Sequence, residues 1–168
     1  MEDTKEQPKI CKAEKEDYRE IAGFMQQVHD LHSQARPDIY KDVQHFYTLE
    51  QFAEDMANPE ILFLTASIRG KLVGMCEMKY HTAGGGSITR KRQRAYVEAI
   101  CVDEKYRNRG IGKLLLMEAE AEARRRNIFK LELTAWHFNQ PVLEFYKNYG
   151  LQCQNCLLYT SPSPRDRG

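Results

Sequence analysis

The sequence contains no apolar run long enough to cross a membrane. Its longest apolar stretches, Ile61 to Leu64 and Leu114 to Met117, fall far short of the roughly 20 residues that a span needs. The segment from Met1 to Asp17 is rich in charged residues and lacks the apolar core of a secretory signal. These absences predict a cytoplasmic protein with no membrane partner.

An excess of one charge and a regular set of cysteines are also missing. Lys and Arg number 25 against 24 Asp and Glu, a net charge of +1, so no overall field favours nucleic acid as a partner. The five cysteines are scattered, and Cys76 and Cys101 lie in apolar segments. We therefore expect reduced cysteines that pack in the interior, and no disulfide framework. The composition, with 42% hydrophobic residues, is that of one globular domain.

The last residues of the chain look foreign to the rest. From Cys156 the sequence Cys-Leu-Leu-Tyr-Thr-Ser-Pro-Ser-Pro-Arg-Asp resembles the conceptual translation of a transposon-type sequencing adapter, and a natural Ser/Pro-rich tail is the alternative. We expect residues 1–155 to form the domain and residues 156–168 to be a non-native tail. Pro162 to Gly168 should be disordered, and Cys156 to Tyr159 are expected to add to an exposed sheet edge.

Hydrophobic periodicity predicts a strand and two helices in the first third of the chain. A short strand is expected at 10–13, and the helix after it should end at Arg36-Pro37-Asp38, because proline stops a helix. Thr48-x-x-Gln51 has the form of a capping box and predicts a second helix that ends at Asn58-Pro59. The apolar residues at helical spacing in the first helix are Ile21, Phe24, Met25, Val28 and Leu31.

The rest of the chain reads as three strands followed by alternating helix and strand. Strand-like runs at 61–68 and 72–80 are joined by Arg69-Gly70-Lys71, which predicts an antiparallel hairpin. A solvated loop at 83–94, with the basic run Arg90 to Arg94, should precede a strand at 96–102. A helix at 110–126, a strand at 129–135 and a helix at 140–148 are expected to complete the domain. The order predicts a mixed α/β domain, an α+β fold with a central mixed sheet flanked by helices.

A glycine-containing motif joins a predicted strand to a predicted helix. The motif is Arg107-x-x-Gly110-x-Gly112, directly after Val102 to Tyr106. Backbone amides at a helix N-terminus, together with the helix dipole, form a site for phosphate oxygens, and glycine lets the ligand approach the backbone. The alternative is a glycine turn that binds no ligand.

A second segment completes a pattern with this motif. Asn139 is a suitable N-cap, Pro141 lies in the first turn of the helix, and Phe145-Tyr146 and Gly150-Leu151 follow. In this order and at this separation, the two segments resemble the acetyl-CoA signatures of the GNAT superfamily of N-acetyltransferases. The resemblance covers residues 9–153 and implies the GNAT acyl-CoA N-acyltransferase fold. Its last two strands would be truncated here, because they normally follow Gly150-Leu151.

The resemblance also implies site residues. The strand near Ile100 to Val102 would align with the pantetheine arm, Asn139 would hydrogen-bond the pantetheine or the acceptor, and Tyr146 would protonate the departing thiolate. Each has a structural alternative: Asn139 as a helix cap, Tyr146 as a core aromatic residue, and Arg107 as a brace of its loop. The implied set that binds acetyl-CoA is Ile100, Val102, Arg107, Asn108, Arg109, Gly110, Ile111, Gly112 and Asn139.

The chemistry needs one further group, a proton acceptor for the incoming amine. A protonated amine with a pKa of about 10 must lose its proton before it can attack. Glu98 is our candidate because alternation on its strand places it on one face with Ile100 and Val102, opposite Ala99 and Cys101. A solvent-facing carboxylate, or one paired with the basic loop, is equally compatible. His29, His32 and Tyr40 are candidates for the acceptor wall or, alternatively, surface residues.

The sequence thus predicts a GNAT-like enzyme that moves an acetyl group from acetyl-CoA to a primary amine by direct attack in a ternary complex. No metal or nucleic acid is implied, the acceptor is a small-molecule amine or a peptide amine, and a homodimer is compatible with the sequence. Two alternatives stay open: a CoA-binding module without turnover, and an acetyltransferase of protein N-termini or lysines.

Overall fold

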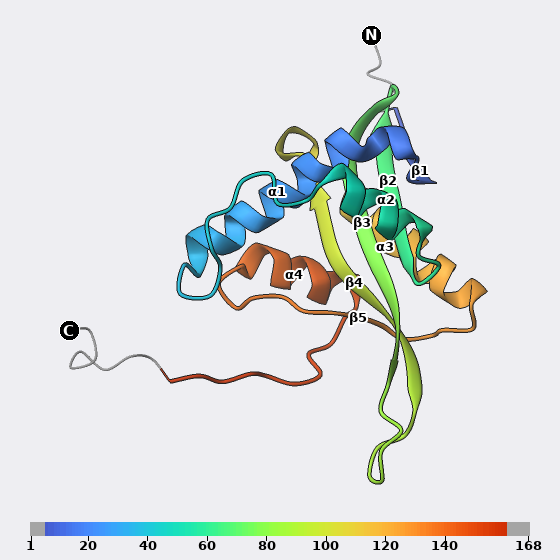
Figure 1. Ribbon diagram of the computed structural model, residues 1–168, viewed down its shortest axis with the longest axis vertical. Helices are drawn as coiled ribbons and strands as arrows, with labels where there is room; N and C mark the ends of the chain where they lie inside the picture. The colour runs from blue at the N-terminus through green and yellow to red at the C-terminus, as the bar shows by residue number, and fades with distance from the viewer. Residues whose placement is uncertain (1–5, 161–168) are drawn as a thin grey trace, which may run out of the picture. The chain divides into compact units, whose positions relative to one another are not determined.

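The computed structural model describes residues 6–160 (Figure 1), and the chain divides between Thr134 and Ala135 into two compact units. The first unit contains β1 (Lys9–Lys12), α1 (Tyr18–Ala35), α2 (Leu49–Ala57), β2 (Ile61–Ile68), β3 (Lys71–Ala83), β4 (Arg92–Val102), α3 (Ile111–Arg125) and β5 (Leu131–Leu133), with short 3-10 helices at Lys15–Asp17 and Glu104–Tyr106. The second unit contains α4 (Gln140–Tyr149). The element order predicted from the sequence is confirmed.

The strands of the first unit form one mixed sheet in the order β1-β2-β3-β4-β5. The first four strands pair antiparallel, and β5 pairs parallel to β4. The β2–β3 hairpin closes through Arg69 and Gly70, both with positive φ, 52° and 74°, as a two-residue hairpin turn requires. The mixed sheet expected from the sequence is therefore confirmed.

Helices cover both faces of this sheet, with α1 and α2 in front of it and α3 behind it in Figure 1. Side chains of α1 and α2 form one core with the facing strand residues. Its main members are Ile21, Phe24, Met25, Phe52, Phe63, Met75, Ala99 and Cys101. On α3 the buried residues are Ile111, Leu115, Leu116, Ala119 and Ala123. Each large aliphatic or aromatic side chain buried in this way stabilises the fold by about 1.5–3 kcal/mol.

The helix boundaries follow the local signals. The hydroxyl of Thr48 accepts a hydrogen bond from the Gln51 amide at 3.1 Å and caps α2, and α1 ends at Ala35, just before Arg36-Pro37. Leu31, which was placed on the apolar face of α1, is an exception because it is 46% exposed. Of the helices between residues 6 and 160, none combines the length and the apolar character of a membrane span.

The strands β3 and β4 run further than the sequence predicts, so part of the expected solvated loop is strand. Arg94 on β4 lies 2.6 Å from the Glu132 carboxylate on β5, and Arg92 lies 3.9 Å from it. Burial opposes ionisation of Glu132, but Arg94, Lys130 and Arg92 outweigh it and hold the pKa of that carboxyl below its usual value. Cross-strand ion pairs of this kind stabilise a sheet.

Two cysteines lie in the interior of the first unit. Cys76 and Cys101 are free and buried, and burial raises their pKa to about 12 and about 11, which keeps them as thiols.

Residues 151–160 contain neither helix nor strand, so the expectation that Cys156 to Tyr159 would add to a sheet edge is wrong. Their lack of a paired register leaves Leu157 and Leu158 93% and 87% exposed. The disorder predicted for Pro162 to Gly168 lies outside the described residues.

Candidate active site

The loop between β4 and α3 presents an open helix N-terminus. Gly110 is the N-cap of α3 with φ of 77°, and no side chain caps the helix. A Cβ atom added at Gly110 would meet no heavy atom within 4 Å. The first amides of a helix have no partner inside it, and here neither a capping side chain nor a Cβ stands in front of them. The arrangement can hold an anion.

The side chains of this loop have separate tasks. The Arg107 Nε donates to the Val102 carbonyl at 3.1 Å, and its guanidinium lies 3.8 Å from Glu104, so Arg107 braces the loop. The guanidinium of Arg109 lies 5.2 Å from the ring centre of Tyr106. Ile111 is 2% exposed, which leaves only its backbone available to a ligand. Arg107 thus has the structural role given as its alternative, that of bracing the loop. The backbone amides remain the candidate phosphate ligands.

Strand β4 loses its neighbour on one side halfway along its length. Its ladder with β3 continues to Val102, whereas its ladder with β5 covers only Ala95 to Val97. Within the unit that ends at Thr134, residues 98–102 therefore have a partner strand on one side alone. An extended ligand can pair with such a strand edge. Ile100 and Val102, both predicted to contact acetyl-CoA, lie in this half of β4.

A β-bulge occurs at Glu98. Met78 pairs with Val97 and Glu77 pairs with Ala99, so Glu98 has no partner on β3. Paired residues share a face of the sheet, and successive residues on β3 point to opposite faces. Val97 and Ala99 consequently face opposite ways, so the bulge interrupts the alternation along β4. Beyond it, Ile100 and Val102 alternate with Ala99 and Cys101 as predicted, and the face that Glu98 shares stays a prediction.

The bulge adjoins a buried charged cluster that our sequence reasoning missed. Glu77 is only 3% exposed, and its carboxylate lies 3.3 Å from Lys79 Nζ. Burial raises the pKa of Glu77, Lys79 opposes this rise, and the charges of Glu98 and Asp55 add to it. The only signal in the sequence is a carboxylate inside an otherwise apolar strand.

Asp55 belongs to the same cluster through a neighbouring tyrosine. The Tyr47 hydroxyl donates to Asp55 Oδ2 at 2.7 Å, and Tyr47 is 8% exposed. Burial and the hydrogen bond to Asp55 both raise the pKa of Tyr47, so it stays a neutral donor. We call Tyr47, Asp55, Glu77, Lys79 and Glu98 the acidic cluster.

The three residues proposed for the acceptor wall come together beside α1. The segment after the helix folds back along it, and His29 Nε2 forms a 2.8 Å hydrogen bond with the Lys41 carbonyl. His32 stacks on Tyr40 at 5.3 Å between ring centres, and His29 lies 4.9 Å from Phe46. Burial, together with His29, lowers the pKa of His32 and favours its neutral form. Phe46 also contacts Tyr47, with 6.4 Å between ring centres, so this wall continues into the acidic cluster.

Asn139 and Tyr146 belong to the second unit, residues 135–160. The Asn139 side-chain oxygen accepts from the Val142 amide at 3.4 Å, so Asn139 caps α4 as the structural alternative had it. Tyr146 is partly buried and lies 5.3 Å from Phe145 between ring centres. Contact of either residue with acetyl-CoA stays a prediction.

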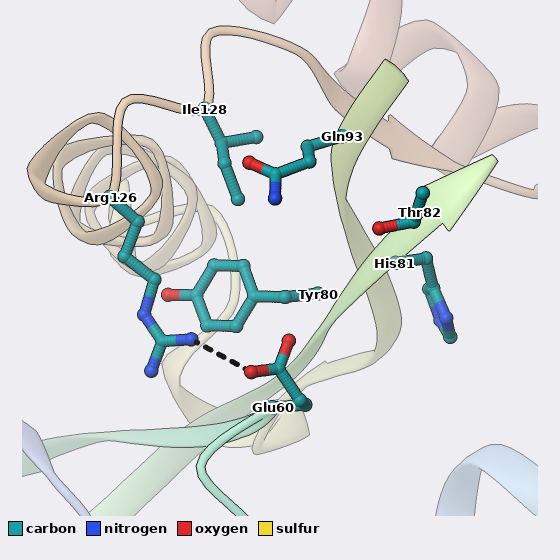
Figure 2. Close-up of a pocket in the computed structure, with 7 residues that line it drawn as sticks. All are labelled: Glu60, Tyr80, His81, Thr82, Gln93, Arg126 and Ile128. Atoms are coloured by element: carbon teal, nitrogen blue, oxygen red, sulfur yellow. Dashed lines mark ion pairs between the residues drawn. The ribbon is translucent and has the colours of Figure 1, made fainter. Parts of the chain in front are cut away.

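A pocket of about 140 Å³ lies at the other end of α3, away from the glycine loop. Figure 2 shows Arg126 laid over the ring of Tyr80 and reaching toward Glu60, 3.9 Å from the ring centre and 3.7 Å from the carboxylate. Arg126 also donates to the Pro59 carbonyl at 2.6 Å. No residue predicted for the active site lines this pocket, and its contacts tie the end of α3 to β2 and β3.

Comparison with known proteins gives a consistent result. Residues 25–151 match the model of the acetyltransferase (GNAT) family. The L-amino acid N-acetyltransferase AaaT of Escherichia coli (strain K12) is 29% identical over 152 residues, which cover 86% of this chain and 83% of AaaT.

Solved structures show the same fold. A mutant of the BH1408 protein from Bacillus halodurans has a TM-score of 0.86 at 24% identity, covering 92% of this chain and 99% of that one. A predicted acetyltransferase with acetyl-CoA from Clostridium acetobutylicum has a TM-score of 0.69 at 18% identity, covering 92% and 96%. With the family match over most of its length, the chain belongs to the acetyltransferase (GNAT) family and is an acetyl-CoA-dependent N-acetyltransferase.

Proposed function

We propose that acetyl-CoA binds along the unpartnered half of β4, with its pyrophosphate at the start of α3. The observation that carries this proposal is the open N-terminus at Gly110, directly after a strand that loses its neighbour at Val97. The backbone of Ile100 and Val102 would pair with the pantetheine arm. The amides from Arg107 to Gly112 would hold the phosphates, and Asn139 would contact the pantetheine or the acceptor.

In the proposed reaction, two side chains move protons. The acceptor's nitrogen forms a bond to the acetyl carbon as the carbon–sulfur bond breaks. Glu98, directly or through water, takes the proton that makes the amine a nucleophile, and Tyr146 supplies a proton to the departing thiolate. Glu98 is exposed and lies at the bulge, within the acidic cluster, which supports its role as the base.

We propose a small-molecule primary amine as the acceptor. AaaT, with which this chain aligns over most of both lengths, is named for L-amino acids, and the wall of His29, His32, Tyr40 and Phe46 would contact such an acceptor. A peptide amine is the second candidate. The cytoplasmic location, a homodimer and the boundary of the domain at residue 155 remain proposals based on the sequence.

The test is thiol release from acetyl-CoA across a panel of amino acids, diamines, aminoglycosides and peptides. Turnover that depends on a small amine is the expected result. Turnover with peptides alone would show that the acceptor is a protein amine and not a small molecule. Binding of CoA without thiol release for any amine would favour the non-catalytic module, and Glu98→Gln should lose turnover while it retains CoA binding.

A further inference from the structure

We propose that Glu77 is a positioning residue of acetyl transfer, a buried carboxylate that takes up, through Glu98 at the bulge, the proton that the acceptor ammonium must lose. This inference rests on the proposed function of Glu98. It assigns a task to a buried residue of β3, outside the glycine loop.

The register of the two strands brings these carboxylates together. Glu77 pairs with Ala99, the residue that follows Glu98, so the bulge places Glu98 beside the β3 position of Glu77. Glu98 is exposed, whereas Glu77 is 3% exposed. An acceptor can therefore reach the exposed Glu98, whereas Glu77 is shielded from it.

The groups around Glu77 allow it to exist with and without a proton. Lys79 on its own strand, Glu98 on β4, and Asp55 and Tyr47 from the α2 side are the charged and titratable groups that act on it, together with the adjacent thiol of Cys76. Burial lowers the pKa of Lys79, but the charges of Glu77, Glu98 and Asp55 outweigh it and raise that pKa. When Glu77 takes a proton, the charges of Glu98 and Asp55 still favour the charged form of Lys79, so the ammonium is not left uncompensated.

The proton balance closes without any further reactant. The acceptor's N–H bond breaks, the proton passes to the Glu98 carboxylate, and Glu98 passes it to Glu77. After the acetylated product leaves, the same path returns the proton to solvent. Tyr146 gives its proton to the thiolate and takes the second nitrogen proton in its place, so each turnover releases one proton. Burial raises the pKa of Glu77, so this carboxyl holds a proton at a higher pH than an ordinary glutamic acid does.

The experiment compares Glu77→Gln with Glu122→Gln in two acceptor amines. Glu122 is a matched control because it lies 3.2 Å from Lys12, is 13% exposed and sits on α3, outside the site. With an alkylamine of pKa about 10, which arrives protonated, Glu77→Gln should lower kcat roughly 100-fold, the lower limit for general acid–base catalysis. With an amine of pKa below about 6, which arrives neutral, the loss should be less than about threefold. Glu122→Gln should leave both rates unchanged.

A second readout follows the charge of Glu77 without turnover. A carboxyl whose folded pKa is raised contributes stability that is present below its unfolded pKa and is lost as the pH rises through the folded pKa. The melting temperature of the parent protein, relative to Glu77→Gln, should therefore fall as the pH rises above the ordinary pKa of a glutamic acid. Glu77→Asp, which keeps the carboxylate, should restore most of the rate with the alkylamine.

Three results would overturn the inference. Equal losses with both amines would assign Glu77 to structure alone, as would a failure of Glu77→Asp to restore any activity in a folded protein. Unchanged alkylamine kinetics in Glu77→Gln would remove Glu77 from the reaction. Absence of thiol release from the parent protein with every amine is a different outcome, because it contradicts the proposed function itself.

Discussion

A valine at Gly110 should abolish tight acetyl-CoA binding without unfolding the protein. Gly110 has φ of 77° and open space where a Cβ would stand, directly at the N-terminus of α3. A branched side chain there would occupy the position that the phosphates need. The chain offers a matched control in Gly70, which has φ of 74°, equally open surroundings and a place in the β2–β3 turn.

The two substitutions should cost similar stability and differ in affinity. An L-residue in the left-handed region costs about 1–2 kcal/mol, a fall in Tm of roughly 2–8 °C for a protein of this size. Loss of one or two hydrogen bonds to a charged phosphate costs about 1.5–3 kcal/mol each, which weakens binding about 10-fold to 100-fold or more. Only Gly110→Val should show this second effect.

Titration calorimetry with CoA, together with circular dichroism for helix content, separates the two contributions. We expect at least tenfold weaker binding for Gly110→Val and less than a twofold change for Gly70→Val. Affinities equal to that of the parent protein in both folded variants would show that the start of α3 does not hold the phosphates. Equal weakening in both would trace the loss to backbone strain spread through the sheet.

Three further outcomes are expected. Tyr146→Phe should lower kcat more than it changes KM for acetyl-CoA, because its hydroxyl acts on the developing thiolate, and unchanged turnover would return Tyr146 to a packing role. Arg126→Ala removes the contacts with Tyr80, Glu60 and Pro59 and should cost about 1–3 kcal/mol in thermal unfolding at unchanged KM values; altered acetyl-CoA kinetics would connect this pocket to the site. Truncation after Cys156 removes the exposed Leu157, Leu158 and Tyr159 and should raise solubility with Tm within about 1 °C, whereas unfolding would show that the tail is native structure.

Local signals were sufficient for most of the fold. The cap at Thr48, the proline after Arg36 and the glycine in the β2–β3 turn each act within four residues, so the sequence carries their effect directly. The same holds for Gly110, whose value as a helix N-cap depends on its own φ. The glycine loop could accordingly be located before any strand pairing was known.

Features that depend on distant pairing were missed. Arg92 and Arg94 look like loop residues until Glu132, about forty positions later, is placed on the next strand. Glu77 is similar, because an isolated carboxylate in an apolar strand does not reveal that Lys79 will pair with it or that Asp55 and Glu98 will lie near it. Register between strands, which no local pattern encodes, decides both cases.

The bulge at Glu98 determines which way the residues on either side of it face. Without an extra residue, Val97 and Ala99 would face the same side, and Ala99 could not pack against α1 and α2 while Val97, the partner of Met78, faces the other side. The bulge reverses the faces of β4 just beyond Val97, where its ladder with β5 ends. Bulges bend and twist a strand, so the reversal gives a physical reason for the parting of β4 and β5. The carboxylate proposed as the base thus lies at the point where β4 loses its partner.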